Sequence, residues 1–315
     1  MKQPVLSSSQ IRSLQTFFGN KLKKGEMLNR YSVMNVGGPA DFLVIVESSQ
    51  DLETFVCFLW EERIPFLLLG GGSNTLISDA GIRELVLINE AKEIKFLDGD
   101  SEHPLLWAES GASFGSLARR AGSKGWSGLE WASGIPGTVG GAVVNNAGAF
   151  GSNVAEKLEM ADILHPSGDN IQRLEWSVDQ FAYGYRSSVI KSGEKQGVVL
   201  SATFRMEIST PAAVKAKISD IAVKRQSSQP SGASLGSMFK NPPGDFAGRL
   251  IEEAGLKGTR VGDVEISSLH GNFFLNKGTA TASDITEMIA QVRDQVHEKF
   301  EVELELEIQF IGDWK

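Results

Sequence analysis

The first feature with chemical meaning is a glycine-rich run at residues 133–151. It carries six glycines, interleaved with small apolar residues and with the pair Asn145 and Asn146. Because glycine has no Cβ, such a backbone can approach a flat or phosphorylated ligand closely and point its N–H groups toward it. The run therefore indicates a cofactor cradle.

A second glycine run has the same character. Gly70, Gly71 and Gly72 come directly after the apolar residues 66–69 and are followed by a serine and an asparagine at 73–74. A strand that ends in a glycine turn is a common place for bare backbone amides to hold a pyrophosphate. This run is a second candidate for cofactor binding.

Neither run matches a nucleotide-binding fingerprint. The longer one lacks the G-x-x-x-x-G-K-[ST] of a phosphate loop, and the spacing of Gly134, Gly137 and Gly140 differs from G-x-G-x-x-G. The alternative is that both runs are tight turns packed for reasons of the fold alone. Two such runs in one chain favour the interpretation as a cofactor-binding site, since structural turns seldom need so many glycines.

The composition is that of an ordinary globular protein, and it narrows the partners. The 315 residues suffice for two or three domains, and 41% hydrophobic with 22% charged residues fits neither a disordered nor a membrane-spanning chain. The formal net charge of −8, with no basic run, argues against nucleic acid as a partner. Without a signal peptide or a bilayer-spanning apolar stretch, we expect a cytoplasmic protein with no membrane partner. We also expect a monomer.

Cysteine and histidine usage argues against metal and disulfide chemistry. Cys57 is the only cysteine, so neither an intramolecular disulfide nor a thiolate metal cluster can form, and a reducing compartment is the simplest setting. The four histidines show no metal-ligand spacing. We expect no metal site.

The first third of the chain alternates strands and helices, which predicts a small α/β unit around the second glycine run. Apolar residues predict strands at 42–46 and 66–69. Between them Ser48, with Asp51 three positions on, is a helix cap, and the apolar residues from 52 to 59 have helical spacing. The next predicted elements are strands at 85–88 and 105–108 and a short helix beginning at Phe114.

The remainder of the chain is predicted to form β-structure as far as Met206 and then a more helical region. Thr210 and Pro211 mark a helix start close to a domain join. Residues 226–236 are polar and rich in serine and glycine, which predicts a loop. Helix and strands follow, with a helix around 246–254 and strands near 261–266 and 272–275.

Two more elements close the chain. Thr281 and Asp284 are the cap signal of a long amphipathic helix. Residues 301–311 alternate polar and apolar side chains, which predicts a terminal strand. The polar face of that strand is formed by Glu303, Glu305, Glu307 and Gln309.

Six short motifs follow one another along the chain. They are Gly-Gly-Pro-Ala at 37–40, Leu-Gly-Gly-Gly-Ser-Asn at 69–74, Ser-Gly-Ile-Pro-Gly at 133–137, Gly-Tyr-Arg-Ser-Ser at 184–188, Gly-Ser-Met-Phe-Lys-Asn-Pro at 236–242 and Glu-Ile-Gln-Phe-Ile-Gly at 307–312. Each motif alone is weak, but six in this order over residues 29–312 are specific. Together they resemble the motifs of the UDP-N-acetylenolpyruvoylglucosamine reductase (MurB) family.

The resemblance implies an α+β fold, in which a two-subdomain FAD-binding domain of the PCMH type precedes an α/β substrate-binding domain. The expected boundaries are 1–208 for the FAD-binding domain, with subdomains of about 1–90 and 91–208, and 209–315 for the substrate-binding domain. The C-terminal strand is expected to return to the active site. The chain is similar to the shorter type of the family, which lacks a substrate-covering tyrosine insertion.

The resemblance also implies an activity: NADPH-dependent reduction of UDP-N-acetylenolpyruvoylglucosamine to UDP-N-acetylmuramate through FAD, in peptidoglycan precursor synthesis. We expect non-covalent FAD, since His103 and Cys57, residues of the kinds that form flavin links, lie outside both glycine runs. Two alternatives stay open. One is another FAD-dependent oxidase or dehydrogenase with the same flavin domain, and the other is a non-catalytic nucleotide-sugar-binding protein that kept the fold.

Three residues in the matching motifs suit this chemistry. Hydride adds to the terminal carbon of the enolpyruvyl group, so negative charge builds on the carboxylate and the adjacent carbon. Arg186 suits charge stabilisation because a guanidinium stays protonated and forks onto a carboxylate. Ser237 suits proton donation to the adjacent carbon. The family pattern before Ile-Gly picks out Glu307, among the glutamates of its face, as the carboxylate that orients the enolate.

The resemblance assigns further residues to the two ligands. Substrate contacts are expected from Tyr185, Arg225, Lys240 and Asn241. The expected cofactor-binding residues are Gly70, Gly71, Gly72, Ser73, Asn74, Ser133, Gly134, Ile135, Gly137, Thr138, Gly140, Gly141, Asn145, Ala147 and Gly148.

Two positions depart from the family pattern. Relatives often carry an aromatic and a basic residue where this chain has Met34 and Asn35. Around Ser228 some relatives place a lysine toward the diphosphate, and this chain has none. Lys240 and Arg225 are therefore the expected counter-charges.

Overall fold

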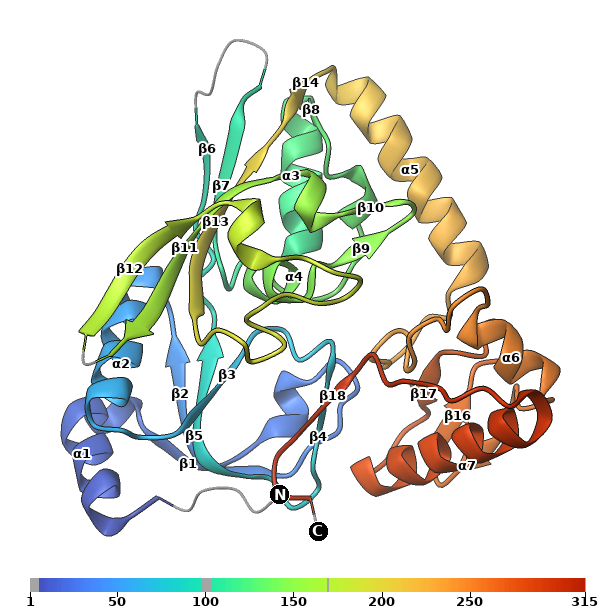
Figure 1. Cartoon of the computed structure of the whole chain (residues 1–315), viewed down its shortest axis with the longest axis horizontal. Coiled ribbons are helices and arrows are strands. Elements are labelled where there is room, and N and C mark those ends of the chain that lie inside the picture. The colour runs from blue at the N-terminus through green and yellow to red at the C-terminus, as the bar shows by residue number, and fades with distance from the viewer. Residues whose placement is uncertain (1–5, 98–102, 169, 315) are drawn as a thin grey trace. The chain divides into compact units, whose positions relative to one another are not determined.

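The structure is a computed structural model that describes residues 6–97, 103–168 and 170–314 (Figure 1). The chain divides into two compact units, and it passes between them more than once. Unit 1 comprises Met1–Val44, Gly72–Val86 and Arg225–Lys315, and unit 2 comprises Ile45–Gly71 and Leu87–Lys224. Each unit therefore combines segments that are distant in sequence.

Unit 2 is built on an antiparallel sheet whose described strands lie in the order β12-β11-β13-β7-β6. The strands are β6 (Ile94–Leu97), β7 (Leu105–Glu109), β11 (Leu158–Ser167), β12 (Asn170–Trp176) and β13 (Val198–Arg205). Side chains alternate between the faces of each strand. Ala202 and Phe204 of the central strand β13 accordingly face the unit's hydrophobic core, while Ser201 points to the opposite face.

Two helices cover the core face of this sheet. They are α3 (Phe114–Lys124), which starts where the sequence predicts, and α4 (Val139–Asn145), which packs on β13 and β7. Figure 1 shows both on one side of the sheet. The fully buried ring of Phe114 lies 5.8 Å from that of Phe204 and 5.5 Å from that of Trp131, so the first residue of α3 is a centre of the core.

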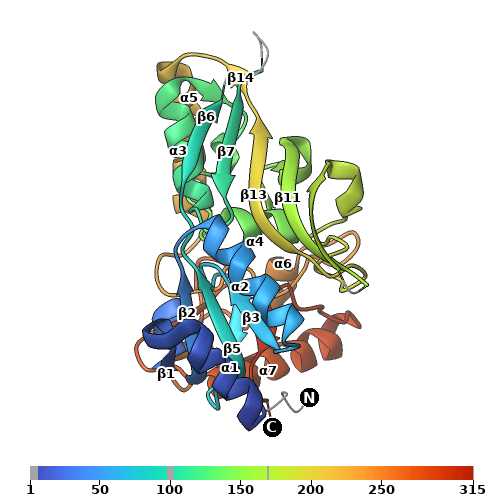
Figure 2. The same ribbon diagram turned by 90° about the vertical axis from the view of Figure 1, so that its left-hand side faces the viewer.

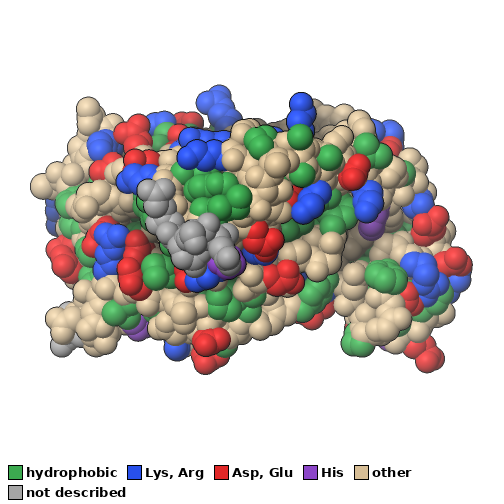
Figure 3. Space-filling view, turned by 90° about the horizontal axis from the view of Figure 1, so that it is seen from above, with side chains coloured by type: hydrophobic (Ala, Val, Ile, Leu, Met, Phe, Trp, Pro, Cys, Tyr) green, Lys and Arg blue, Asp and Glu red, His purple; other side chains and the backbone are tan. Residues whose placement is uncertain are grey.

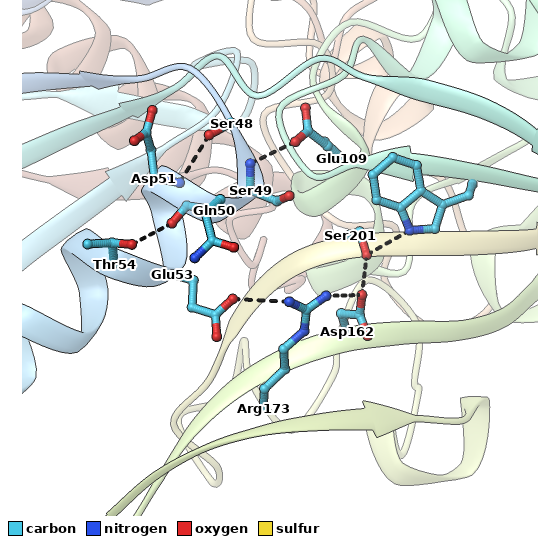
Figure 4. Close-up of polar contacts among 11 residues, drawn as sticks. Ser48, Ser49, Gln50, Asp51, Glu53, Thr54, Glu109, Asp162, Arg173 and Ser201 are labelled. Atoms are coloured by element: carbon cyan, nitrogen blue, oxygen red, sulfur yellow. Dashed lines mark hydrogen bonds and ion pairs between the residues drawn. The ribbon is translucent and has the colours of Figure 1, made fainter.

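The opposite face carries a polar network that holds helix α2 (Ser49–Glu61), which Figure 2 shows in front of the sheet. Arg173 donates to Glu53 of α2 at 3.0 Å and to Asp162 of β11 at 2.9 Å, and Ser201 donates to Asp162 at 2.7 Å (Figure 4). The helix begins at the predicted cap, since the Ser48 hydroxyl accepts from the backbone N–H of the third residue on. This fixed helix leads into the strand before the second glycine run.

Unit 1 has its core under the long helix α7 (Ala282–Phe300) and the short helix α6 (Ala247–Glu253). The predicted cap is confirmed, because Thr281 and Asp284 form a reciprocal capping box. Helix α7 packs on α6 and on a small antiparallel sheet in the order β15-β16-β17. Its strands are β15 (Arg260–Val261), β16 (Val264–Ile266) and β17 (Phe274–Asn276).

The remaining elements include a sheet in the order β1-β2-β5-β3 and a parallel pair of β4 with β18. Their strands are β1 (Lys23–Met27), β2 (Pro39–Val46), β3 (Phe66–Leu69), β4 (Thr75–Ile77), β5 (Ile82–Asn89) and β18 (Gln309–Ile311). Further α-helices and strands are α1 (Ser8–Phe18), α5 (Pro211–Ser228), β8 (Trp126–Ser127), β9 (Gly148–Ala149), β10 (Ser152–Asn153) and β14 (Glu207–Ile208).

The predicted terminal strand over 301–311 is wrong for most of its length. Only Gln309–Ile311 forms a strand, which pairs with β4, while Leu306 makes a single bridge to Phe239. The burial still alternates, with Leu304 buried between exposed glutamates. Period-two burial arises in any extended segment that lies on a core, whereas a strand also needs a continuous hydrogen-bonding partner.

Two smaller predictions also need correction. The expected strand at 261–266 is a hairpin, because Gly262, with φ of 52°, turns the chain between β15 and β16. The loop expected from residue 226 starts later, since α5 continues to Ser228. The start of α5 is as predicted, with Pro211 first and the Thr210 hydroxyl accepting from the Ala213 N–H at 3.2 Å.

Two further properties of the structure are the apolar character of its helices and the charge on one face of its surface. Within the described ranges, no helix has both the length and the apolar character needed to span a bilayer. On the face drawn in Figure 3, acidic and basic side chains are interspersed. That face therefore presents no extended field of one sign.

Candidate active site

The two glycine runs contact each other within unit 2. A Cβ at Gly71 would lie 3.1 Å from the Cα of Gly137, and one at Gly70 would lie 2.4 Å from the Oγ1 of Thr138. A side chain at either position would push the two runs apart. Close packing for reasons of the fold, the alternative considered for these runs, thus accounts for part of their glycine content.

Other parts of the longer run are open to a ligand. Gly141 is exposed, and a Cβ placed there would meet only the Thr138 hydroxyl, at 3.5 Å. That hydroxyl caps α4 by accepting from the Gly141 N–H at 3.3 Å. The Oδ1 atom of Asn145 is buried and accepts no hydrogen bond from any residue that the structure describes. Because buried polar atoms are almost always paired, this acceptor fits a bound polar ligand in the cradle.

The loop that carries Arg186 is fastened to the C-terminal end of α4, also within unit 2. Side-chain-to-backbone bonds run from Tyr183 Oη to the Val143 carbonyl (2.8 Å), from Ser188 Oγ to the Val144 carbonyl (2.6 Å) and from Asn146 Nδ2 to the Gly184 carbonyl (3.1 Å). Burial raises the pKa of Tyr183, which keeps its hydroxyl a donor. The cradle and the Arg186 loop are therefore positioned by the same short helix.

Arg186 itself has an unusual backbone. Its φ of 54° lies in the left-handed region, which is uncommon for a residue with a side chain and is found more often at functional sites. Lys191 Nζ donates to the Arg186 carbonyl at 2.9 Å, and the guanidinium carbon lies 5.8 Å from the ring centroid of Tyr185. Tyr185, 60% exposed, leaves its ring available to a ligand.

Asn146 has a role that the sequence does not reveal. It is half of an asparagine pair, but nothing in its spacing connects it to a loop 38 residues later. It ends α4 in a left-handed conformation with φ of 45°. Asparagine after a short helix is a known C-cap signal, and this signal locates the turn without revealing the side chain's partner.

Unit 1 brings the segments of Ser237 and Glu307 together. The Glu307 N–H donates to the Met238 carbonyl at 2.9 Å, and the Lys240 N–H donates to the Glu305 carbonyl at 2.8 Å. Met238 and Phe239 are buried and anchor the segment, while Ser237 is only half-buried. The predicted proton donor and the predicted orienting carboxylate thus lie on adjacent extended segments.

Asn74, from the end of the second glycine run, joins the same group. Its Nδ2 donates to the Glu307 carbonyl at 3.2 Å, and its own carbonyl accepts from the Gln309 N–H at 2.9 Å. A predicted cofactor residue and a predicted catalytic residue, 233 positions apart in sequence, are therefore neighbours. The two short motifs that contain them form one local structure.

The expected substrate contacts of unit 1 have intramolecular partners. Lys240 forms an ion pair with Glu305, and Asn241 Oδ1 accepts from the Ala247 N–H at 3.1 Å, at the start of α6. Arg225 Nη1 donates to Gln229 at 2.8 Å, and burial lowers the pKa of its guanidinium. At the departing position 34, the methionine is fully buried in the core of unit 1 and Asn276 Nδ2 donates to its carbonyl at 2.9 Å.

The predicted site residues fall on both units. Those of unit 2 are Gly70, Gly71, Ser133, Gly134, Ile135, Gly137, Thr138, Gly140, Gly141, Asn145, Ala147, Gly148, Tyr185 and Arg186. Those of unit 1 are Gly72, Ser73, Asn74, Arg225, Ser237, Lys240, Asn241 and Glu307. Among the described residues, no group of histidine, cysteine, aspartate and glutamate could hold a metal ion.

Comparison with known proteins connects this geometry to a family. Residues 228–311 match the model of the UDP-N-acetylenolpyruvoylglucosamine reductase C-terminal domain, and residues 40–172 match that of an FAD-binding domain. The UDP-N-acetylenolpyruvoylglucosamine reductase of Chloroflexus aurantiacus is 40% identical over 91% of this chain and 96% of its own length. The chain belongs to the UDP-N-acetylenolpyruvoylglucosamine reductase (MurB) family. A second relative, from Listeria monocytogenes, is 37% identical over 97% of this chain and all of its own.

A solved MurB structure supports the same assignment. The crystal structure of UDP-N-acetylenolpyruvylglucosamine reductase (MurB) from Thermus caldophilus matches with a TM-score of 0.76 and 34% identity, covering 90% of this chain and 97% of its own. The family resemblance and the α+β fold class, with an FAD-binding domain of the PCMH type, are confirmed. As a MurB family member with an FAD-binding domain, the chain is an FAD-dependent oxidoreductase.

Proposed function

We propose that this protein reduces UDP-N-acetylenolpyruvoylglucosamine to UDP-N-acetylmuramate, with NADPH as the hydride donor, in the cytoplasm and as a step of peptidoglycan precursor synthesis. Two relatives named as that reductase match this chain over nearly their whole length. The structural observation that supports the activity most directly is the pairing of the Ser237 and Glu307 segments through the Glu307 N–H and the Met238 carbonyl. A nucleotide-sugar-binding protein without catalytic activity would not need both Ser237 and Glu307.

The proposal divides the chain as the sequence predicts. Residues 1–208 bind FAD and residues 209–315 bind the UDP-sugar, and the protein acts as a monomer. The match of residues 40–172 to an FAD-binding domain and of 228–311 to the reductase C-terminal domain supports this division. When bound, FAD carries hydride between NADPH and the sugar substrate.

FAD is held by the two glycine runs in this proposal. Gly70, Gly71 and residues 133–148 supply the cradle in unit 2, and residues 72–74 of the second run are also assigned to FAD. The buried, unpaired Oδ1 atom of Asn145 and the exposed backbone at Gly141 support the fit. The cofactor is held without a covalent link.

Three side chains then act on the enolpyruvyl group. Arg186 stabilises the negative charge that builds on the carboxylate, because its planar guanidinium forks onto two oxygens at once. Ser237 donates a proton to the carbon beside that carboxylate, and Glu307 orients the developing enolate. Tyr185, Arg225, Lys240 and Asn241 bind the rest of the substrate.

The function is tested by anaerobic reoxidation. Protein reduced with NADPH should recover its oxidised flavin absorbance when the enolpyruvyl UDP-sugar is added. UDP-N-acetylglucosamine, which lacks the enolpyruvyl group, should leave it reduced. Recovery with both sugars, or with neither, would contradict the proposed substrate, and the alternative of another flavin oxidase predicts recovery on admitting air alone.

Arg186→Lys should not behave as a conservative change. A point ammonium cannot fork onto a carboxylate, so we expect turnover to fall about 10²-fold or more, the loss typical of one preorganised stabiliser. Arg173→Lys is the matched control, because it makes the same change in the network that fixes α2 (Figure 4). Steady-state turnover of both variants measures the difference, and near wild-type turnover of Arg186→Lys would remove Arg186 from the catalytic set.

A further inference from the structure

Asn272 is a buried asparagine of unit 1 to which neither the sequence motifs nor the proposed mechanism gives a role. It is 2% exposed and lies just before β17. Its Oδ1 accepts from the Phe239 N–H at 2.9 Å, and its Nδ2 donates to the Phe239 carbonyl at 2.8 Å. A single side chain thus satisfies both backbone groups of one buried residue.

The backbone of the same residue continues this pairing toward Ser237. The Asn272 carbonyl accepts from the Met238 N–H at 2.9 Å, and Ser237 forms a bridge with Phe273. The side-chain amide of Asn272 therefore makes the two hydrogen bonds to Phe239 that the backbone of a neighbouring strand would otherwise make. Ser237, Met238 and Phe239 are each fixed from this side.

The other side of the segment is paired with the chain around Glu307. Phe239 bridges Leu306, and the Glu307 N–H donates to the Met238 carbonyl. The segment 237–240 is consequently the middle layer of three, with Asn272 on one side and Glu307 on the other. If Asn272 were replaced by a smaller residue, Phe239 could shift into the vacated space, and the spacing between Ser237 and Glu307 would change.

We propose that Asn272 is a positioning residue for the proton-transfer step, which it serves by fixing the backbone of Phe239 and so the placement of Ser237. The inference rests on the proposed function, in which Ser237 donates the proton. Asn272 does not touch the substrate in this account. A displacement of about 1 Å at a reacting group costs on the order of 10²-fold in rate. We therefore expect the two hydrogen bonds to Phe239, two residues after Ser237, to affect the rate of proton transfer.

A purely structural role is the competing explanation. Buried backbone groups need partners, and leaving the Phe239 N–H and carbonyl unsatisfied destabilises a protein whatever its activity. The test must therefore separate the two half-reactions. Flavin reduction by NADPH requires no proton at the Ser237 position, whereas reoxidation by the enolpyruvyl sugar does.

The experiment compares Asn272→Ala and Asn272→Asp with the control Ser267→Ala. Ser267 is equally buried and begins the same turn, where its hydroxyl accepts from the Leu269 and His270 N–H groups and not from residues 237–240. We expect Asn272→Ala to bind FAD and to be reduced at a near-normal rate, while its reoxidation slows about 10²-fold. Ser267→Ala should keep both rates, even if its unfolding transition shifts as far.

Asn272→Asp gives an internal rescue. The carboxylate can still accept from the Phe239 N–H, but only its protonated form can donate to the carbonyl as the amide does. A carboxyl buried beside a carbonyl has a raised pKa, so it becomes protonated at a higher pH than an exposed carboxyl does. The reoxidation rate of Asn272→Asp, relative to wild type, should therefore rise toward low pH, and Asn272→Ala should show no such gain.

Amide hydrogen exchange provides the readout of position. In Asn272→Ala the Phe239 amide should lose protection, while the Lys240 amide, which donates to Glu305, keeps it. Equal slowing of both half-reactions, or normal reoxidation despite lost protection at Phe239, would overturn the positioning role. Failure of the proposed function is distinguishable, because the unmodified protein would then not be reoxidised by the enolpyruvyl sugar at all.

Discussion

Ser237→Ala is expected to be reduced by NADPH at a near-normal rate and to be reoxidised by the enolpyruvyl sugar about 10² to 10⁴-fold more slowly. The second figure is the range for loss of a positioned general acid. The first follows because the flavin takes hydride without any proton from Ser237. Anaerobic rapid-mixing absorbance at the flavin band measures each half-reaction separately.

Two further variants make this expectation specific. Ser237→Cys should retain part of the reoxidation rate, since a thiol is still a donor in nearly the same place. Ser234→Ala, which removes a hydroxyl that accepts from the Gly236 N–H at 3.2 Å, is the control for disturbance of the loop. If both halves slow equally in Ser237→Ala, the serine holds the flavin or the loop, and Glu307 becomes the next candidate for the proton donor.

Gly137→Leu is expected to abolish FAD binding. Gly137 has φ of 108°, a conformation that residues with side chains rarely adopt, and its Cα lies against the position of a Cβ on Gly71. A side chain here strains the backbone and would intrude where the proposed cradle meets its ligand. The purified variant should be colourless and should remain so when titrated with FAD.

The control must place a side chain at another positive-φ glycine, away from the cradle. Gly193 has φ of 78° with open space around the position of its Cβ, so Gly193→Ala should lose about 1 kcal/mol of stability and keep its full flavin content. Thermal unfolding of the apoproteins tests whether Gly137→Leu still folds. A folded, yellow Gly137→Leu would show that this glycine serves packing alone.

Local chemistry made several elements predictable from sequence. The helix starts at Ser48, Thr210 and Thr281 were found because a capping side chain and its partner lie within three residues of each other. The terminal strand was predicted wrongly, because alternating polarity indicates burial on one side and does not show whether another strand lies within hydrogen-bonding reach. Only the last three residues of that stretch, Gln309–Ile311, reach the partner β4.

The candidate site divides in the same way. The glycine runs stand out by composition, but their mutual contact joins Gly71 to Gly137, and no periodicity predicts it. The roles of Arg186 and Ser237 came from the family resemblance and remain predictions. Side chains that fix the site through distant backbone groups, such as Asn272, leave no sequence pattern, since one asparagine with one partner has no repeat or spacing to detect.

The interleaving of the units has a consequence for how the chain acquires its structure during synthesis. Asp79 accepts hydrogen bonds from the N–H groups of Ala282 and Ser283, more than 200 residues later, and β4 obtains its partner only from Gln309–Ile311. Much of unit 1 must therefore wait until residues 282–311 have left the ribosome, whereas unit 2 draws on one continuous stretch and an early segment. Pairings of such long range are slow to form, so we expect unit 2 to fold before unit 1 is complete.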